Sequence, residues 1–266
     1  MRRIANPLAA SIAGAALVTI AATIYLMHGM AAGPGADLGS FSWFVLTWVV
    51  MMAAMMLPSV APMAMTFALV TAQRSAKGQA AFVPTWIFIA GYFAAWTAYG
   101  IAAYGIDHLI RWWNPAFLAW NHGGPWIAGA SVALAGLYQL TPIKRRCLAH
   151  CRSPLHFFLE DWREGPLGAW QMGLHHGFFC VACCWGLMLL LFAVGVMSLF
   201  WMSAIAVLIF AEKVFGAGPR LATVFGVAIL ALGVWIAVAP GTVPGLTPPA
   251  CLMEMPGMPG MKMPCA

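Results

Sequence analysis

Charged residues are scarce in this chain of 266 residues, in which Asp, Glu, Lys and Arg together make up only 8%. Hydrophobic residues make up 63%, and the mean hydropathy is +0.87. A soluble domain of this size could not shield so much apolar surface from water. The shortage of charge therefore excludes a soluble globular protein, and it indicates an all-α polytopic integral membrane bundle in contact with the lipid bilayer.

The chain also lacks a continuous basic segment and a long internal repeat. Its formal net charge is +6, but its Lys and Arg residues lie in short clusters between apolar runs. Clusters in such positions are typical of signals for membrane topology, not of a nucleic-acid surface. We therefore expect no nucleic-acid partner.

About seven apolar runs indicate transmembrane helices, although the shorter runs must extend into their flanks. The first run exceeds a typical signal-peptide core and lacks a small-residue cleavage site, so we interpret it as a helix. We expect a transmembrane domain over residues 1–240 and a separate tail over 241–266. The runs cover roughly Pro7 to Met27, Phe41 to Val70, Phe82 to Ile106, Trp126 to Leu140, Pro166 to a turn near Gly195, Met197 to Ala211 and Leu221 to Ala239.

Lys and Arg residues concentrate in alternate loops between these runs. The N-terminus and the loops at 71–79, 144–165 and 212–220 hold nearly all of them, whereas the opposite loops hold Arg111 alone. By the positive-inside rule, the N-terminus is cytoplasmic and the tail is periplasmic in a bacterial inner membrane.

One apolar run differs from an ordinary membrane span because it contains two histidines and three cysteines. In a helix, four soft or borderline metal ligands of this run share a face roughly 100° wide: His176, Cys180, Cys183 and Cys184. Gly173 and Gly177 border that face and would let a second helix approach closely. This face is the main candidate metal site.

A group of four methionines lies near the middle of the second run: Met51, Met52, Met55 and Met56. Methionine commonly fills gaps in apolar cores, so packing is the simpler explanation. However, the group lies at a depth similar to that of the cysteine motif. Pro58 and Pro62 also interrupt the backbone hydrogen-bond ladder nearby, as happens where membrane helices line a site. Thioether and thiolate ligands together suit Cu(I), so we include these methionines as candidate ligands.

A third group, Cys147, His150 and Cys151, lies in the longest polar segment. Its spacing differs from that of paired-cysteine zinc motifs, and no second cysteine pair occurs there, so a zinc site would be incomplete. The group is either an incidental set of reduced thiols or a point where metal is handed on. Nearby arginines, including Arg145 and Arg146, should lower the pKa of both thiols.

The tail is rich in Pro and Gly and cannot form a packed core, so we expect it to be disordered without metal. It contains five closely spaced methionines, Met253, Met255, Met258, Met261 and Met263, with Cys251 and Cys265 on either side. Thioethers do not form disulfides and remain available to Cu(I) in an oxidising compartment. The composition thus favours copper capture outside the membrane.

Three segments resemble the signatures of a bacterial family of predicted metal-binding integral membrane proteins of unknown function. They are Met51 to Ser59, Lys144 to Pro154, and His176 to Met188, which contains a Cys-x-x-Cys-Cys-Trp sequence. The resemblance implies metal binding through His176 and the three cysteines that follow it, but it implies no reaction.

These features favour a membrane protein that binds Cu(I) for copper transfer, import or delivery to a cuproenzyme, with a periplasmic copper protein or cuproenzyme as partner. Zinc is a weaker alternative as the metal. The main functional alternative is a membrane thiol-disulfide oxidoreductase that exchanges electrons with Cys251 and Cys265, although disulfide exchange does not require methionines. A third alternative is a structural or haem-binding subunit. Its axial ligands would come from His28, His108, His122, His175 and His176.

Overall fold

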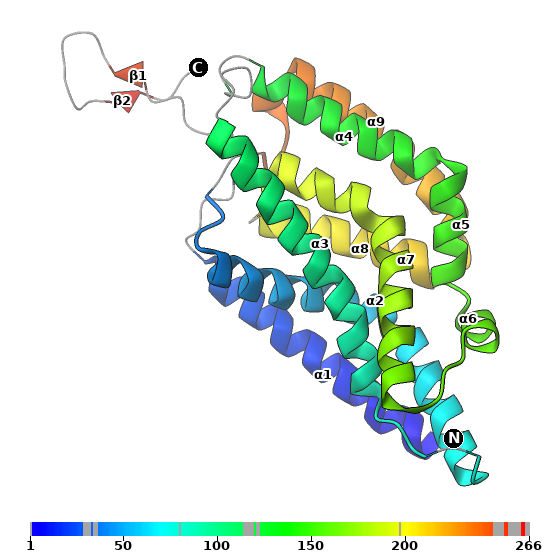
Figure 1. Cartoon of the computed structure of the whole chain (residues 1–266). Helices are drawn as coiled ribbons and strands as arrows, with labels where there is room; N and C mark the ends of the chain where they lie inside the picture. The colour runs from blue at the N-terminus through cyan, green and yellow to red at the C-terminus, as the bar shows by residue number, and fades with distance from the viewer. Residues whose placement is uncertain are drawn as a thin grey trace.

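The computed structural model describes residues 2–28, 33, 37–79, 81–113, 120, 123–196, 198–246, 253–254 and 262–263. Within these residues, nine α-helices form a bundle, as composition predicted (Figure 1). A 3-10 helix, Pro240–Thr242, follows the last α-helix. In the tail, strand β1 (Met253–Glu254) pairs antiparallel with strand β2 (Lys262–Met263).

Five helices in the described part of the chain are long and apolar enough to cross a membrane. They are α1 (Arg2–Met27), α2 (Phe41–Ala76), α3 (Thr85–Trp113), α7 (Gly165–Val194) and α9 (Gly218–Val238). The remaining helices are α4 (Gly124–Leu140), α5 (Pro142–Cys151), α6 (Pro154–Glu160) and α8 (Leu199–Val214). Helix α4 is long enough to span a membrane only together with α5, from which it is bent by 67°. Helix α8 has 16 residues and is shorter than the five spans. By length and composition the described residues therefore contain five or six spans, compared with the roughly seven that we expected.

Several helices extend further than the apolar runs predicted. Helix α3 continues past Ile106 to Trp113, where an ion pair between Arg111 and Asp107, four residues apart, supports the added turns. Helix α8 continues through Glu212 and Lys213, which we had expected in a loop. The polar segment after residue 144 forms α5 and α6, so hydropathy alone underestimated the helical content.

Helix α7 packs closely against α3 because glycines remove side chains from the contact. A Cβ atom on Gly173 would collide with the backbone oxygen of Phe88, and one on Gly177 would lie 2.7 Å from the backbone oxygen of Tyr92. The predicted close approach of a second helix is therefore confirmed, and α3 is that helix.

Helix α2 is continuous although both Pro58 and Pro62 lie inside it. It packs against α1, α3 and α8, whereas α7 packs mainly against α3, α4 and α5. The two helices that carry the main candidate ligands thus share α3 as a neighbour, whereas α1 packs against α2 and both α4 and α5 pack against α7.

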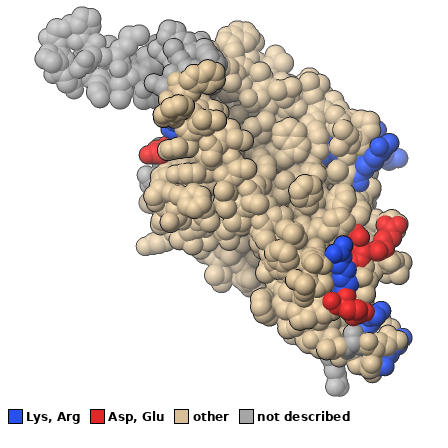
Figure 2. Space-filling view, in the orientation of Figure 1, with Lys and Arg blue, Asp and Glu red and all other residues tan. Residues whose placement is uncertain are grey.

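Charged side chains gather toward one end of the bundle in the view of Figure 2, and the rest of that face is mostly uncharged. The end of α2 meets the start of α7 at this end, through an ion pair between Arg74 and Glu164. Helix α5 carries the exposed Arg145 and Arg146. The structure therefore has one strongly polar end and an extensive apolar surface.

Candidate metal centre

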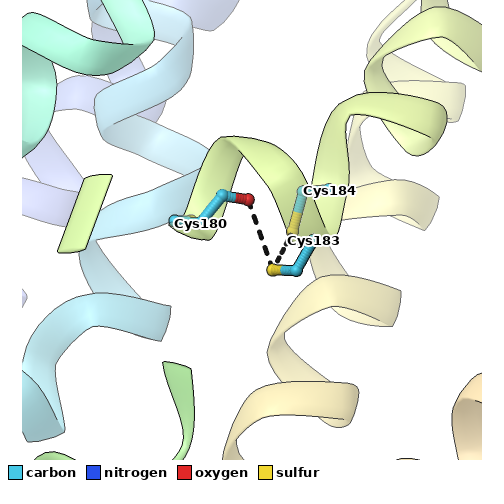
Figure 3. Close-up of side chains that lie close together, drawn as sticks. All are labelled: Cys180, Cys183 and Cys184. Carbon is cyan, nitrogen blue, oxygen red and sulfur yellow. Dashed lines mark hydrogen bonds between the residues drawn. The ribbon is translucent and has the colours of Figure 1, made fainter. Parts of the chain in front are cut away.

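Three thiols lie together in the middle of α7, within 4.8 Å of one another: those of Cys180, Cys183 and Cys184 (Figure 3). Each residue is at most 1% exposed. The Sγ atom of Cys183 lies 3.3 Å from that of Cys184 and donates a hydrogen bond to the backbone oxygen of Cys180 at 3.2 Å. Sulfur ligands in such an arrangement could hold a soft metal ion.

A fourth thiol approaches this cluster from α5. The Sγ atom of Cys151 lies 3.8 Å from that of Cys183, because the bend between α4 and α5 places α5 against α7. Of the three candidates in this segment, Cys151 is thus the one with a direct contact to the thiol cluster. All five cysteines in the described residues are free thiols.

The other two candidates in α5, Cys147 and His150, are partly buried, while Arg145 and Arg146 beside them are exposed. The expected effect of these arginines on the thiol pKa values stays a prediction.

Polar groups from two other helices converge on Cys180. The Lys213 ammonium of α8 donates a hydrogen bond to its Sγ atom at 2.7 Å, and the Tyr92 hydroxyl of α3 lies 3.0 Å from the same atom. A cation beside a sulfur atom favours the thiolate, which is the form that binds metal. The site is therefore assembled from several helices.

A buried ion pair supports the other side of the cluster. The Lys144 ammonium donates to the backbone oxygen of Cys183 at 2.6 Å and to the Glu212 carboxylate at 2.8 Å. The two side chains are 0% and 1% exposed, and Gln139 donates a further hydrogen bond to Glu212 at 2.7 Å. These groups satisfy one another in an environment where an unpaired charge would be costly.

Sequence reasoning missed Lys144, Glu212 and Lys213, because charges beside apolar runs were read only as topology signals. The positions of these residues in the sequence could have identified them. Glu212 and Lys213 directly follow one apolar run, and Lys144 lies within one helical turn of the end of another apolar run. We expected both run ends on the same side of the membrane. Opposite charges at the ends of neighbouring spans can pair inside a bundle.

His176 is 3% exposed but does not belong to the three-thiol cluster. Its ring stacks near Phe88 and Tyr92 and meets Phe157 edge-on. Its buried Nδ1 atom has no hydrogen-bond partner among the described residues. The structure therefore brings together three of the four ligands predicted on α7 and leaves the fourth beside them.

The sequence analysis did not identify two further buried methionines on α7 as candidate ligands. Met172 and Met188 extend a four-residue spacing through His176, Cys180 and Cys184, and all five side chains are buried. The Sδ atom of Met172 accepts a hydrogen bond from the backbone amide of Arg163 at 3.3 Å. The regular spacing was visible in the sequence and could have identified both.

The four candidate methionines of α2 are all at most 3% exposed and lie in the same apolar core as the cysteines. Met55 lines a cavity of about 360 Å³ between α1, α2 and α8, together with Met202. The Sδ atom of Met56 accepts a hydrogen bond from Ser59 at 3.8 Å. These contacts are compatible with packing as well as with metal binding.

Three of the five candidate methionines of the tail, Met255, Met258 and Met261, lie outside the described residues, as do Cys251, Cys265 and His122. Of the remaining two, Met253 and Met263 are partners in the β1–β2 pairing. The copper-capture role of the tail therefore stays a prediction.

The fold and the buried thiols define a class: a helical bundle with membrane-spanning lengths and a cysteine cluster that could bind a metal. Within that class, the chain belongs to the PpoB2 copper chaperone family, whose model matches residues 45–236. The matched range contains the α2 methionines, α5 and the thiol cluster, but not the tail. Comparisons with curated proteins and with solved structures found no match. Family membership thus supports a role in copper handling.

Proposed function

We propose that this protein is a membrane-embedded copper chaperone that holds Cu(I) at Cys180, Cys183 and Cys184 and passes it to a periplasmic copper protein or a cuproenzyme. The observation that carries the proposal is the proximity of three buried thiols inside the region that matches the copper chaperone family. Sulfur ligands select Cu(I) over harder cations.

The charges around the cluster support this function. Coordination by several thiolates leaves a Cu(I) complex with a net negative charge, which is expensive in an apolar interior. The ammonium group of Lys213 lies against the Cys180 sulfur and offsets part of that charge, whereas the ammonium group of Lys144 is already paired with the Glu212 carboxylate. The same surroundings would allow copper to leave by exchange of sulfur ligands, without oxidation or reduction.

The proposed orientation places the N-terminus in the cytoplasm and the tail in the periplasm. Lys144 and Lys213 point inward and no longer count as surface charges, but Arg74 near the end of α2 and Arg145 and Arg146 on α5 remain on the side where we expected the positive loops. By the positive-inside rule this side is cytoplasmic, and the tail reaches the periplasm if the bent pair of α4 and α5 forms one span and α8 crosses the membrane as well. In this orientation, the tail methionines would collect copper on the periplasmic side.

Metal analysis of the full-length protein, purified in detergent after loading with Cu(I) under reducing conditions, tests the proposal. The triple variant C180S/C183S/C184S should lose nearly all of the copper held by the cluster, because hydroxyl groups are poor ligands for Cu(I). The matched control C251S/C265S, which changes tail cysteines in the same way, should retain it. Unchanged copper in a folded triple variant would show that these thiols are not ligands.

A further inference from the structure

Two imidazoles lie close together where α5 covers the first half of α7, outside the thiol cluster. The ring centroids of His150 and His175 are 6.2 Å apart, with an angle of 71° between the rings. Phe179 covers the His150 ring at 4.0 Å, whereas the His175 side chain is 45% exposed. The pair therefore has one member inside the protein and one at its surface.

The nitrogen atoms of this pair have the features of metal ligands. The Nε2 atom of His150 is buried and has no hydrogen-bond partner among the described residues. The Nδ1 atom of His175 lies 3.1 Å from a carboxylate oxygen of Asp161. A carboxylate on one ring nitrogen fixes the tautomer and directs the other nitrogen toward a metal.

The last turn of α5 connects this pair with the thiol cluster. His150 faces His175 and Phe179, while the next residue, Cys151, has its Sγ atom 3.8 Å from that of Cys183. Ligands therefore extend from the half-exposed His175, through His150 and Cys151, to the buried thiols.

We propose that His150 and His175 form a second copper site, a portal through which Cu(I) passes between the charged end of the bundle and the thiol cluster by way of Cys151. The inference rests on the proposed function, since it gives the buried site a route to solvent. In the loading direction, the bond between copper and His150 breaks as a bond to the Cys151 sulfur forms. The proton that the thiol loses passes to the released imidazole, so no oxidant or reductant is needed.

Two measurements on the full-length protein in detergent test the portal. In the C180S/C183S/C184S background, competition with a chromogenic Cu(I) chelator should detect weak binding that includes the histidine site. The added changes H150A/H175A should lower this binding by one copper ion per chain, while the binding by the tail methionines remains. With the thiols intact, stopped-flow detection of copper–thiolate absorption should show H150A/H175A loading at least about tenfold more slowly, because ligands near the cluster raise the local copper concentration. The final copper content should stay the same.

The control is His156→Ala, because His156 forms a similar histidine–carboxylate pair with Glu160 on α6 but is 61% exposed. It should load at the wild-type rate, whereas Asp161→Asn should weaken the portal site by about tenfold, as expected for a residue that positions a metal ligand. Wild-type loading by folded H150A/H175A, or an unchanged weak site, would overturn the portal. If the wild type lacks copper–thiolate absorption but the histidine site binds, the proposed function fails, the role of this site as a portal fails with it, and only a copper site at His150 and His175 remains.

Discussion

The α7 cysteines and the α2 methionines are both soft, buried side chains within the family match, yet their surroundings differ. Cys180 and Cys183 receive contacts from α3, α5 and α8, including two ammonium groups. The polar contact described for an α2 methionine is with Ser59, a residue of the same helix.

The difference shows how a site can be told from packing in an apolar bundle. Soft side chains alone are poor discriminators, because methionine and cysteine both pack well in cores. Buried charges are costly unless they are paired, so their convergence from several helices on one cluster calls for an explanation that packing does not provide.

The largest effect on stability is expected when the carboxylate that pairs with Lys144 is removed. Glu212→Ala leaves a buried ammonium group without its carboxylate, and we expect the free energy of unfolding to fall by about 3–5 kcal/mol. Denaturation of the detergent-solubilised protein measures this loss. The double variant K144M/E212L, which removes both charges, should recover much of it.

The control for that change is Glu160→Ala, since Glu160 is 58% exposed and pairs with His156 at the surface. Exposed pairs contribute at most about 1 kcal/mol, so this variant should remain close to the wild type. Equal effects of Glu212→Ala and Glu160→Ala on the free energy of unfolding would show that the buried network does not stabilise the α7 region.

Much of the α7 region could be predicted because helical geometry is local. Spacings of three and four residues place Cys180, Cys183 and Cys184 together on any regular helix, and glycines on a membrane helix indicate close packing. Composition alone was sufficient for the helical bundle. These features need no knowledge of the neighbouring helices.

The partners of the cluster could not be predicted in the same way, because they are distant in the sequence. Lys144 and Glu212 are 68 residues apart, and Cys151 and Cys183 are 32 apart. Their meeting depends on the 67° bend after α4 and on the extension of α8, neither of which hydropathy records. The number of spans likewise depends on the short helices α4 and α8, which hydropathy alone does not assign.

Replacing the four α2 methionines with leucine tests whether these residues bind copper or only pack in the core. Leucine has a similar volume, so each single change should cost less than about 1.5 kcal/mol. If these residues serve mainly in packing, the quadruple variant M51L/M52L/M55L/M56L should keep its copper while C180S/C183S/C184S loses it. Metal analysis of both variants measures the copper that each retains. Equal loss of copper from both variants would mean that the methionines and the cysteines form one site.

The smallest effect is expected from the tail, and only when copper is scarce. Deletion of residues 249–266 removes five methionines and two cysteines but none of the helices described above. If the tail collects copper, tethered ligands raise the local concentration, so the deletion should slow loading at limiting copper and have no effect when copper is in excess. Copper loading measured over a range of buffered Cu(I) concentrations checks this dependence.

The tail cysteines separate copper transfer from disulfide exchange. For a copper collector, C251S/C265S should have little effect, because the methionines remain and thioethers bind Cu(I) without them. A thiol-disulfide oxidoreductase would instead need this pair to exchange electrons with the α7 thiols. In that case the double serine variant would lose activity as fully as the deletion, and added copper would rescue neither. That result would exclude copper transfer as the role of the tail and favour a redox role for the α7 cysteines.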